Sequence, residues 1–329
     1  MDKCLPSRPV LLTGATGFVG RAVYPVLVAS GRAVRSMTRD ALKAAERWPG
    51  RAWVSADVSD EASTARALEG CDAAFYLVHG MAAGGADFRR REVEQATQFA
   101  RAAERAGVRR VVYLGGVAAP HGGSEHLRSR KEVGEALRSA HVTTVELRAS
   151  MIIGHGSLSW LIVRDLAARL PVMVLPRWLK SRTQPVAIDD VVAALVGALE
   201  APLDESAWFD VPGPDVLSGR EILERTAAIL GVRRPLMVEV PLLTPRLSSH
   251  WVRLVTRADW TVAREVVIGL TDDLLARDDR FWTLIGQPGP LGFDEAARRA
   301  IAAERSAGPV RGAWGAVERA LAAPPGERA

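Results

Sequence analysis

The chain has 329 residues, of which 48% are hydrophobic and 25% charged, a composition typical of a globular protein with one large α/β domain plus an appendage, or with two domains. Its net charge of +5 comes from arginines spread along the sequence rather than from a dense basic block, which argues against nucleic acid as a partner. No apolar run reaches the length of a transmembrane helix, and the two cysteines lack neighbours of metal-ligand type, so we expect a cytoplasmic protein.

Short apolar runs alternate with helical patterns through the first 150 residues, which is typical of a parallel sheet covered on both faces. We expect six strands, at residues 9–12, 33–38, 52–56, 72–78, 110–114 and 143–147. Helices are expected between them, at residues 20–29, 62–68, 89–106 and 129–140. This order predicts an α/β fold with a doubly wound parallel sheet, a Rossmann fold, over residues 1–150.

Beyond residue 150 the pattern is less regular. We expect a short strand at 183–188, a helix at 191–199 capped by Asp189 or Asp190, and a strand at 208–211. Ser218 followed by Glu221 is a capping box, which predicts a helix over 218–230. Residues 151–232 are therefore predicted to form a cleft and to complete the fold with late strands.

Residues 233–329 are predicted to be a helix-rich C-terminal extension for a substrate or a partner, with Trp251, Trp260 and Trp282 along it. Four roles stay open for these tryptophans: the lining of an apolar pocket, a face for a protein partner or a second copy, contact with a membrane surface, or packing in the core.

A glycine-rich loop lies directly between the first strand and the first helix. It reads Gly14-Ala15-Thr16-Gly17-Phe18-Val19-Gly20. The first glycine permits a tight turn, the second lets the backbone approach a pyrophosphate, and the third lets helix and strand pack closely. The N–H groups at the helix start would face the phosphates. The loop therefore predicts a dinucleotide-binding site.

The end of the second strand discriminates between the two nicotinamide cofactors. An NAD site needs an acidic residue there, whereas this chain has Arg39, followed by Asp40. Arg39 can bind a 2′-phosphate bidentately, and Arg35 would add positive charge, so NADP(H) is preferred. The alternative is NAD(H), with Asp40 on the ribose and Arg39 in solvent. Asp57 and Val58 are predicted to contact the adenine, and Leu77, Val78 and His79 to lie under the ribose and pyrophosphate.

The segments TGATGFVG, ADVSD and YLVHG resemble the extended and atypical branches of the short-chain dehydrogenase/reductase superfamily. SEHLRSRKEVGEAL and LRASMIIGHGSLSW are similar to a bacterial atypical subgroup related to NmrA-like regulators and to an accessory subunit of respiratory complex I. The resemblance implies an NAD(P)-binding oxidoreductase. It also implies a Tyr-x-x-x-Lys pair for proton transfer and a Ser or Thr at the end of the fifth strand.

This chain departs from that pattern at each of the three catalytic positions. No tyrosine is followed four residues later by lysine, and Gly115-Gly116-Val117 ends the fifth strand without a hydroxyl. Alignment of HLRSR on the family motif places His126 at the tyrosine position and Arg130 at the lysine position. A histidine can move protons near neutral pH, and Arg130 can hold a ribose hydroxyl but cannot shuttle protons. The alternative for His126 is an ordinary surface residue at a helix start.

Three functions follow from these residues. The first is a reductase of atypical mechanism acting on a quinone-like or other apolar carbonyl acceptor. The second is a catalytically inactive NADP(H) sensor or an assembly or regulatory protein. The third, isomerase or dehydratase chemistry on a nucleotide sugar, would need the missing tyrosine and serine. No histidine has metal-ligand spacing with cysteine or carboxylates, so no metal is expected.

Overall fold

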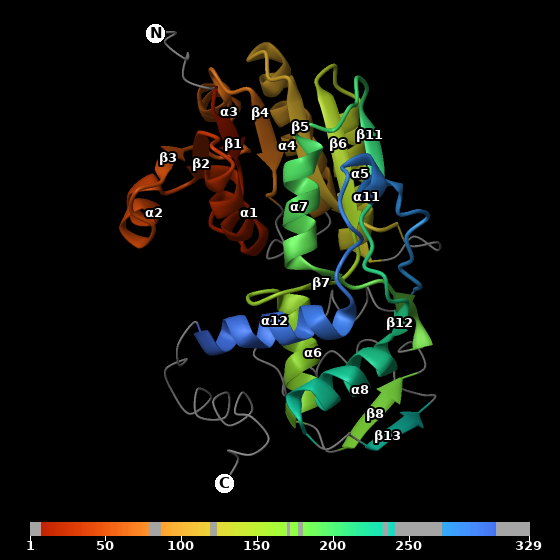
Figure 1. The fold of residues 1–329 in the computed structure, drawn as a ribbon. Helices are drawn as coiled ribbons and strands as arrows, with labels where there is room; N and C mark the ends of the chain where they lie inside the picture. The colour runs from red at the N-terminus through yellow and green to blue at the C-terminus, as the bar shows by residue number, and fades with distance from the viewer. Residues whose placement is uncertain are drawn as a thin grey trace.

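The computed structural model describes residues 8–78, 87–118, 124–169, 180–232 and 272–306, together with the backbone of 172–176 and 236–240. Its centre is a parallel sheet of seven strands in the order β11-β6-β5-β4-β1-β2-β3 (Figure 1). The strands are β1 (Val10–Leu12), β2 (Val34–Thr38), β3 (Ala52–Ser55), β4 (Ala73–Tyr76), β5 (Arg110–Gly116), β6 (Thr143–Ala149) and β11 (Ala207–Asp210). The strand order reverses between β1 and β4, and in such sheets ligands bind at the carboxyl ends of the strands at that point. The predicted doubly wound α/β fold is confirmed.

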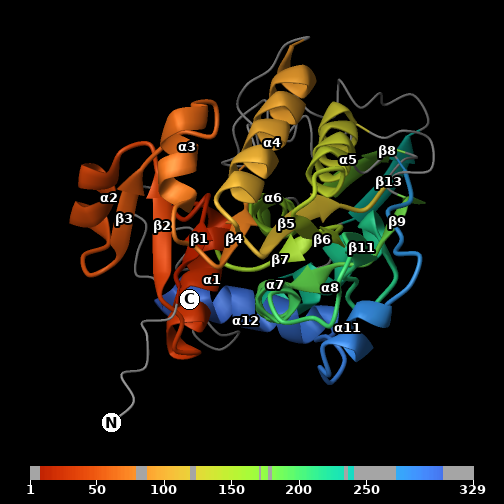
Figure 2. The same cartoon turned by 90° about the horizontal axis from the view of Figure 1, so that it is seen from above.

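Helices cover both faces of the sheet (Figure 2). On one face lie α1 (Phe18–Ala29) and α7 (Ile188–Ala198), and on the other lie α3 (Glu61–Leu68), α4 (Phe88–Arg105) and α5 (Glu125–Arg138). Alternate residues of β1 divide between the two cores, since Val10 and Leu12 pack with α1 and α7 while Leu11 packs with α3 and α4. The short helix α2 (Ala41–Arg47) joins β2 to β3.

A second group of elements lies beyond the carboxyl ends of the strands (Figure 1). Three helices, α6 (Leu158–Arg169), α8 (Gly219–Leu230) and α12 (Phe293–Ser306), share a core that includes Trp160, Leu223 and Phe293. Short strand pairs accompany them: β7 (Ile152–Ile153) with β10 (Val186–Ala187), β9 (Arg182–Thr183) with β12 (Leu217–Ser218), and β8 (Val172–Pro176) with β13 (Leu236–Val240). None of the described helices combines the length and apolar character needed to cross a membrane.

A further helix of the described residues, α11 (Arg280–Leu284), returns to the main sheet. Its Trp282 is buried and donates its indole N–H to the Pro212 carbonyl over 3.1 Å. Core packing is therefore the role of this tryptophan. Trp251 and Trp260 lie outside the described residues.

Several expected boundaries are wrong for identifiable reasons. Helix α5 begins at Glu125 rather than 129, because the Ser124 hydroxyl accepts the Leu127 N–H and caps it. Helix α7 begins at Ile188, without a side-chain cap, so Asp189 and Asp190 lie within its first turn. Asp190 instead accepts the Leu291 N–H over 2.8 Å. The expected strand at 183–188 is divided into β9 and β10, whereas the predicted Ser218–Glu221 capping box is confirmed.

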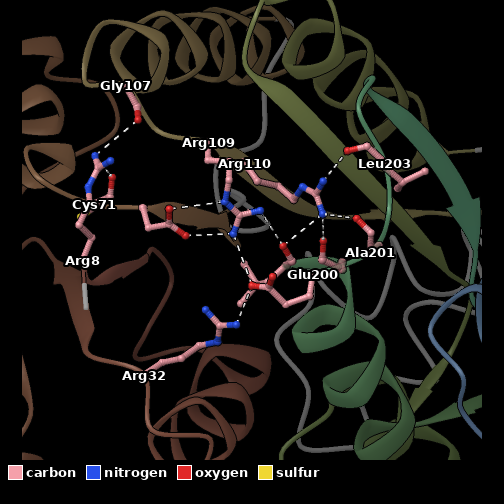
Figure 3. Close-up of polar contacts among 12 residues, drawn as sticks. Arg8, Arg32, Cys71, Gly107, Arg109, Arg110, Glu200, Ala201 and Leu203 are labelled. Atoms are coloured by element: carbon pink, nitrogen blue, oxygen red, sulfur yellow. Dashed lines mark hydrogen bonds and ion pairs between the residues drawn. The ribbon is translucent and has the colours of Figure 1, made fainter. Parts of the chain in front are cut away.

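An arginine-rich network, the basal network, ties helix ends to the amino ends of the strands, opposite the cofactor edge (Figure 3). Arg110 is 5% exposed and donates to the carbonyls of Ala198, Leu199, Ala201 and Leu203, at the end of α7 and just after it. Arg8 similarly reaches the Cys71 and Gly107 carbonyls, after α3 and α4. Arg109 and Arg32 converge on Glu200. These contacts satisfy carbonyls that have no partner within their helices and place positive charge at helix C-termini.

Candidate cofactor and acceptor site

The glycine loop has the close packing that its sequence predicts. Gly14 has a φ of +62°, and a Cβ on it would lie 2.5 Å from the Leu77 carbonyl oxygen. A Cβ on Gly20 would lie 2.3 Å from the Gly14 carbonyl oxygen. Both distances are shorter than real Cβ contacts, so these two positions require glycine. Gly17 is less constrained and serves as the N-cap of α1.

Thr13 joins this loop to the end of β4. Its hydroxyl donates to the Phe75 carbonyl over 2.8 Å and accepts the Leu77 N–H over 2.9 Å. Leu77 and Val78 then pack against the two cores on opposite faces of the sheet. The N-terminus of α1 has no side-chain cap. Its first backbone N–H groups are therefore free of a capping side chain and can donate to a ligand bound at the loop. Ala15, Thr16, Phe18 and Val19 complete this turn, and His79 lies outside the described residues.

The charged residues at the end of β2 have three different environments. Asp40 accepts the Lys43 N–H over 2.9 Å and caps α2. Arg35 was expected near the cofactor, but its guanidinium donates over 2.7 Å to the carbonyls of Ala67 and Glu69 at the end of α3. Arg39 is exposed, and within the described part of the chain its guanidinium makes no hydrogen bond. Arg39 is thus the cation available for a ligand at this strand end.

Asp57 and Val58 follow β3 at the same edge. The Asp57 carboxylate accepts the backbone N–H and the hydroxyl of Ser59, and its backbone N–H donates to the Ser63 hydroxyl. Val58 packs against the core under α3 and α4. These contacts hold the turn in a fixed conformation beside β2.

His126 and Arg130 lie in the first turns of α5, next to the end of β5. Arg130 donates to the Gly115 carbonyl over 3.4 Å, and its own carbonyl accepts the Tyr113 hydroxyl over 3.1 Å. His126 is half-buried, with its ring edge-on to Phe88 at a centroid distance of 5.2 Å. The structure therefore brings Arg130 to the strand end.

A buried carboxylate beside this position was missed by sequence reasoning. Glu146 in β6 is fully buried and pairs with Arg138 of α5 and with Arg148. A Cβ on Gly115 would lie 2.9 Å from its Oε1, and one on Gly134 would lie 2.5 Å from its carboxyl group. The two glycines make room for Glu146. Two features of the sequence could have indicated this arrangement: a glycine inside a helix, Gly134, and a glutamate inside a buried strand, Glu146.

The tyrosines near the site are not placed as proton donors. Burial raises the pKa of both Tyr76 and Tyr113 well above the ordinary value for a phenol. In the helices that cover this face of the sheet, the Ser129 hydroxyl donates to the buried Glu92 carboxylate over 2.8 Å and links α5 to α4.

The serines of the turn after β6 have structural roles. The Ser150 hydroxyl donates to the Gln184 carbonyl over 2.7 Å. The Ser157 hydroxyl donates to the Ile152 carbonyl over 2.7 Å and accepts the Trp160 N–H. Across the described residues, no group of three or more His, Cys, Asp or Glu side chains is placed to hold a metal ion.

Comparisons with known proteins agree with this geometry. Residues 14–169 match the NAD(P)H-binding family. The chain is 31% identical over 240 residues to the (4-alkanoyl-5-oxo-2,5-dihydrofuran-3-yl)methyl phosphate reductase of Streptomyces griseus, covering 70% of this chain and 76% of that protein. It is 26% identical over 235 residues to the ceramide reductase of Caulobacter vibrioides, covering 70% and 73%.

A solved structure shares the fold. The triphenylmethane reductase of a Citrobacter species, crystallised with NADP(H), superposes with a TM-score of 0.69 at 17% identity, covering 89% of this chain and 99% of that one.

Proposed function

Because the chain belongs to the atypical short-chain dehydrogenase/reductase family of NAD(P)H-binding proteins, we propose that it is an NADP(H)-dependent reductase of an apolar, carbonyl-bearing acceptor. The observation that carries the proposal is the glycine loop at the N-terminus of α1, with Arg39 unpaired within the described residues at the end of β2. Both curated relatives are named as reductases, and each name describes a molecule with an acyl group.

The residues of the loop fit a dinucleotide. Gly14, Gly17 and Gly20 leave the backbone open to a pyrophosphate, and the first N–H groups of α1 would donate to it. Arg39 would pair with a 2′-phosphate, since Asp40 is engaged in capping α2. Asp57, Val58, Leu77 and Val78 would frame the adenosine, and Arg130 would lie near the nicotinamide ribose. When bound, the cofactor supplies a hydride.

A binding experiment tests the cofactor assignment. The substitution Arg39→Ala is expected to weaken NADPH binding by about 10- to 100-fold, the worth of a charge-assisted pair, and to leave NADH binding unchanged. Lys43→Ala is the matched control, because Lys43 lies on the adjoining helix and, within the described residues, hydrogen-bonds through its backbone N–H alone. Fluorescence titration of both cofactors measures the effect. An equal loss for NADPH and NADH, or no loss at all, would contradict the assignment.

A second candidate is a non-catalytic NADP(H) sensor or assembly factor. It is favoured because this chain lacks the Tyr, Lys and Ser that the family uses for catalysis. Its partner surface would be the C-terminal helices. Steady NADPH oxidation with a panel of enones, quinones and ketones supports the reductase. Tight NADPH binding with no oxidation, together with a different affinity for NADP⁺, supports the sensor.

A further inference from the structure

We propose that Arg130 stabilises a negative charge that forms on the acceptor, and that the acceptor is an electron-poor carbon–carbon double bond conjugated to two carbonyl groups. This inference rests on the proposed reductase function and names its substrate class. It follows from which groups the end of β5 offers and which it withholds.

The end of β5 withholds a proton donor. Gly115 cannot be replaced by a serine without a collision, because the Glu146 carboxylate occupies the space of its Cβ. Tyr113 donates its hydroxyl to the Arg130 carbonyl, and burial raises the pKa of this phenol, so Tyr113 is held away from an acceptor. Direct reduction of a ketone produces an alkoxide, a strong base that needs a proton as it forms. No described residue of the strand end itself supplies one, and the neighbouring His126 is half-buried with its ring packed edge-on against Phe88.

The same strand end offers a fixed cation. Arg130 is half-buried and is held by two hydrogen bonds. Its backbone carbonyl accepts the Tyr113 hydroxyl, and its guanidinium donates to the Gly115 carbonyl. A guanidinium has five N–H donors in a planar fork and stays charged at all working pH values. It can therefore bind two oxygens of an anion side by side, but it cannot protonate them.

Conjugate reduction of a doubly activated alkene matches this chemistry. NADPH is the reductant, and its hydride forms a new C–H bond at the β-carbon while the alkene π electrons move onto the two carbonyl oxygens. The resulting 1,3-dicarbonyl enolate is a weak base, so it needs charge stabilisation and takes its proton from water afterwards. The fork of Arg130 matches the two enolate oxygens. NADP⁺ and the saturated dicarbonyl compound are the products.

Binding of an enolate mimic tests the role of Arg130 without turnover. The probe is 2-acetylcyclohexane-1,3-dione, which is an anion at neutral pH, and its neutral counterpart is 2-acetylcyclohexanone. Calorimetry in the presence of NADP⁺ should show that Arg130→Met weakens binding of the anion by about 10- to 100-fold. The affinity for the neutral compound should be unchanged. Lys131→Met is the matched control, because Lys131 is the next residue, is exposed and pairs with Glu135. Unchanged anion affinity in Arg130→Met, or an equal loss in Lys131→Met, would overturn the proposal.

Isotope labelling tests the substrate class. With 2-acetylcyclohex-2-enone and NADPH deuterated at C4, we expect deuterium at the β-carbon, and in D₂O we expect solvent deuterium at the α-carbon. Saturated 2-acetylcyclohexanone should not be reduced. Deuterium on a carbinol carbon, or reduction that survives Arg130→Met and depends on His126, would overturn the inference while leaving the reductase function intact. Failure to oxidise NADPH with any acceptor would instead count against the proposed function, and the calorimetry would still decide the role of Arg130.

Discussion

Gly134→Ala should destabilise the fold although it replaces a glycine inside a helix. In an open helix the change would stabilise by about 1 kcal/mol, because alanine has the higher helix propensity. Here the added Cβ would lie 2.5 Å from the carboxyl group of the fully buried Glu146. Overpacking of this kind costs about 1–3 kcal/mol, and displacement of Glu146 from Arg138 or Arg148 disturbs a buried ion pair. We expect a net loss of about 2–4 kcal/mol in the free energy of unfolding.

Urea unfolding followed by circular dichroism measures the loss, and a second background sharpens the test. Glu146→Ala should itself cost about 3–5 kcal/mol, because the buried Arg148 and the partly buried Arg138 lose their partner. In that background Gly134→Ala should become stabilising by about 1 kcal/mol, since the clash is gone and the helix propensity remains. Gly197→Ala in α7 is the control, because the atoms nearest to its Cβ would belong to the apolar side chain of Ile285, at 3.1 Å, and not to a buried charge. A neutral or stabilising Gly134→Ala in the native background would refute the reasoning.

Three further predictions concern other parts of the molecule. Gly20→Ala, whose Cβ would lie 2.3 Å from the Gly14 carbonyl oxygen, should abolish NADPH binding in a fluorescence titration; retained affinity would contradict the role of the loop. Arg110→Met should lower the free energy of unfolding by about 2–4 kcal/mol, because four carbonyls lose a charged donor, and it should leave NADPH affinity unchanged in the folded protein. Burial raises the pKa of Asp165 from 3.8 to about 6, so the folded state holds this proton more tightly than the unfolded state. The free energy of unfolding should therefore fall, by up to about 3 kcal/mol, as pH rises from about 4 to 6. Asp165→Asn should flatten that slope in urea titrations, and an unaltered slope would show that another group is responsible.

The sequence predicted the core of the fold because its signals are local. Strands β1 to β6 are short apolar runs, and the glycine loop lies between a strand and a helix, so spacing alone places it. Helix α2 was missed, since its seven residues show little periodicity and its cap is Asp40, which had been considered as a ribose ligand. The boundary of α7 was misplaced because tertiary contacts, such as Asp190 with the Leu291 N–H, occupy the expected capping side chains.

The candidate site was predictable only in part. Loop glycines and Arg39 follow from position along the chain, whereas the direction of a long side chain does not. Arg35 is three residues before the end of β2, and the unpaired carbonyls of α3 draw its guanidinium away from the cofactor edge. Glu146 could not be foreseen as a neighbour of Gly115 and Gly134, since their proximity depends on the packing of α5 against β5 and β6.

The basal network has a consequence for the chemical durability of the protein. The chain contains four lysines, and its cationic contacts at the amino ends of the strands are made by arginine. A guanidinium keeps its proton in alkaline solution, where a lysine would lose it, and it is inert to reagents that acylate amines. Arg8, Arg32, Arg109 and Arg110 therefore keep the helix ends attached during coupling to amine-reactive supports (Figure 3). The protein should tolerate immobilisation through its few lysines with its basal edge unmodified.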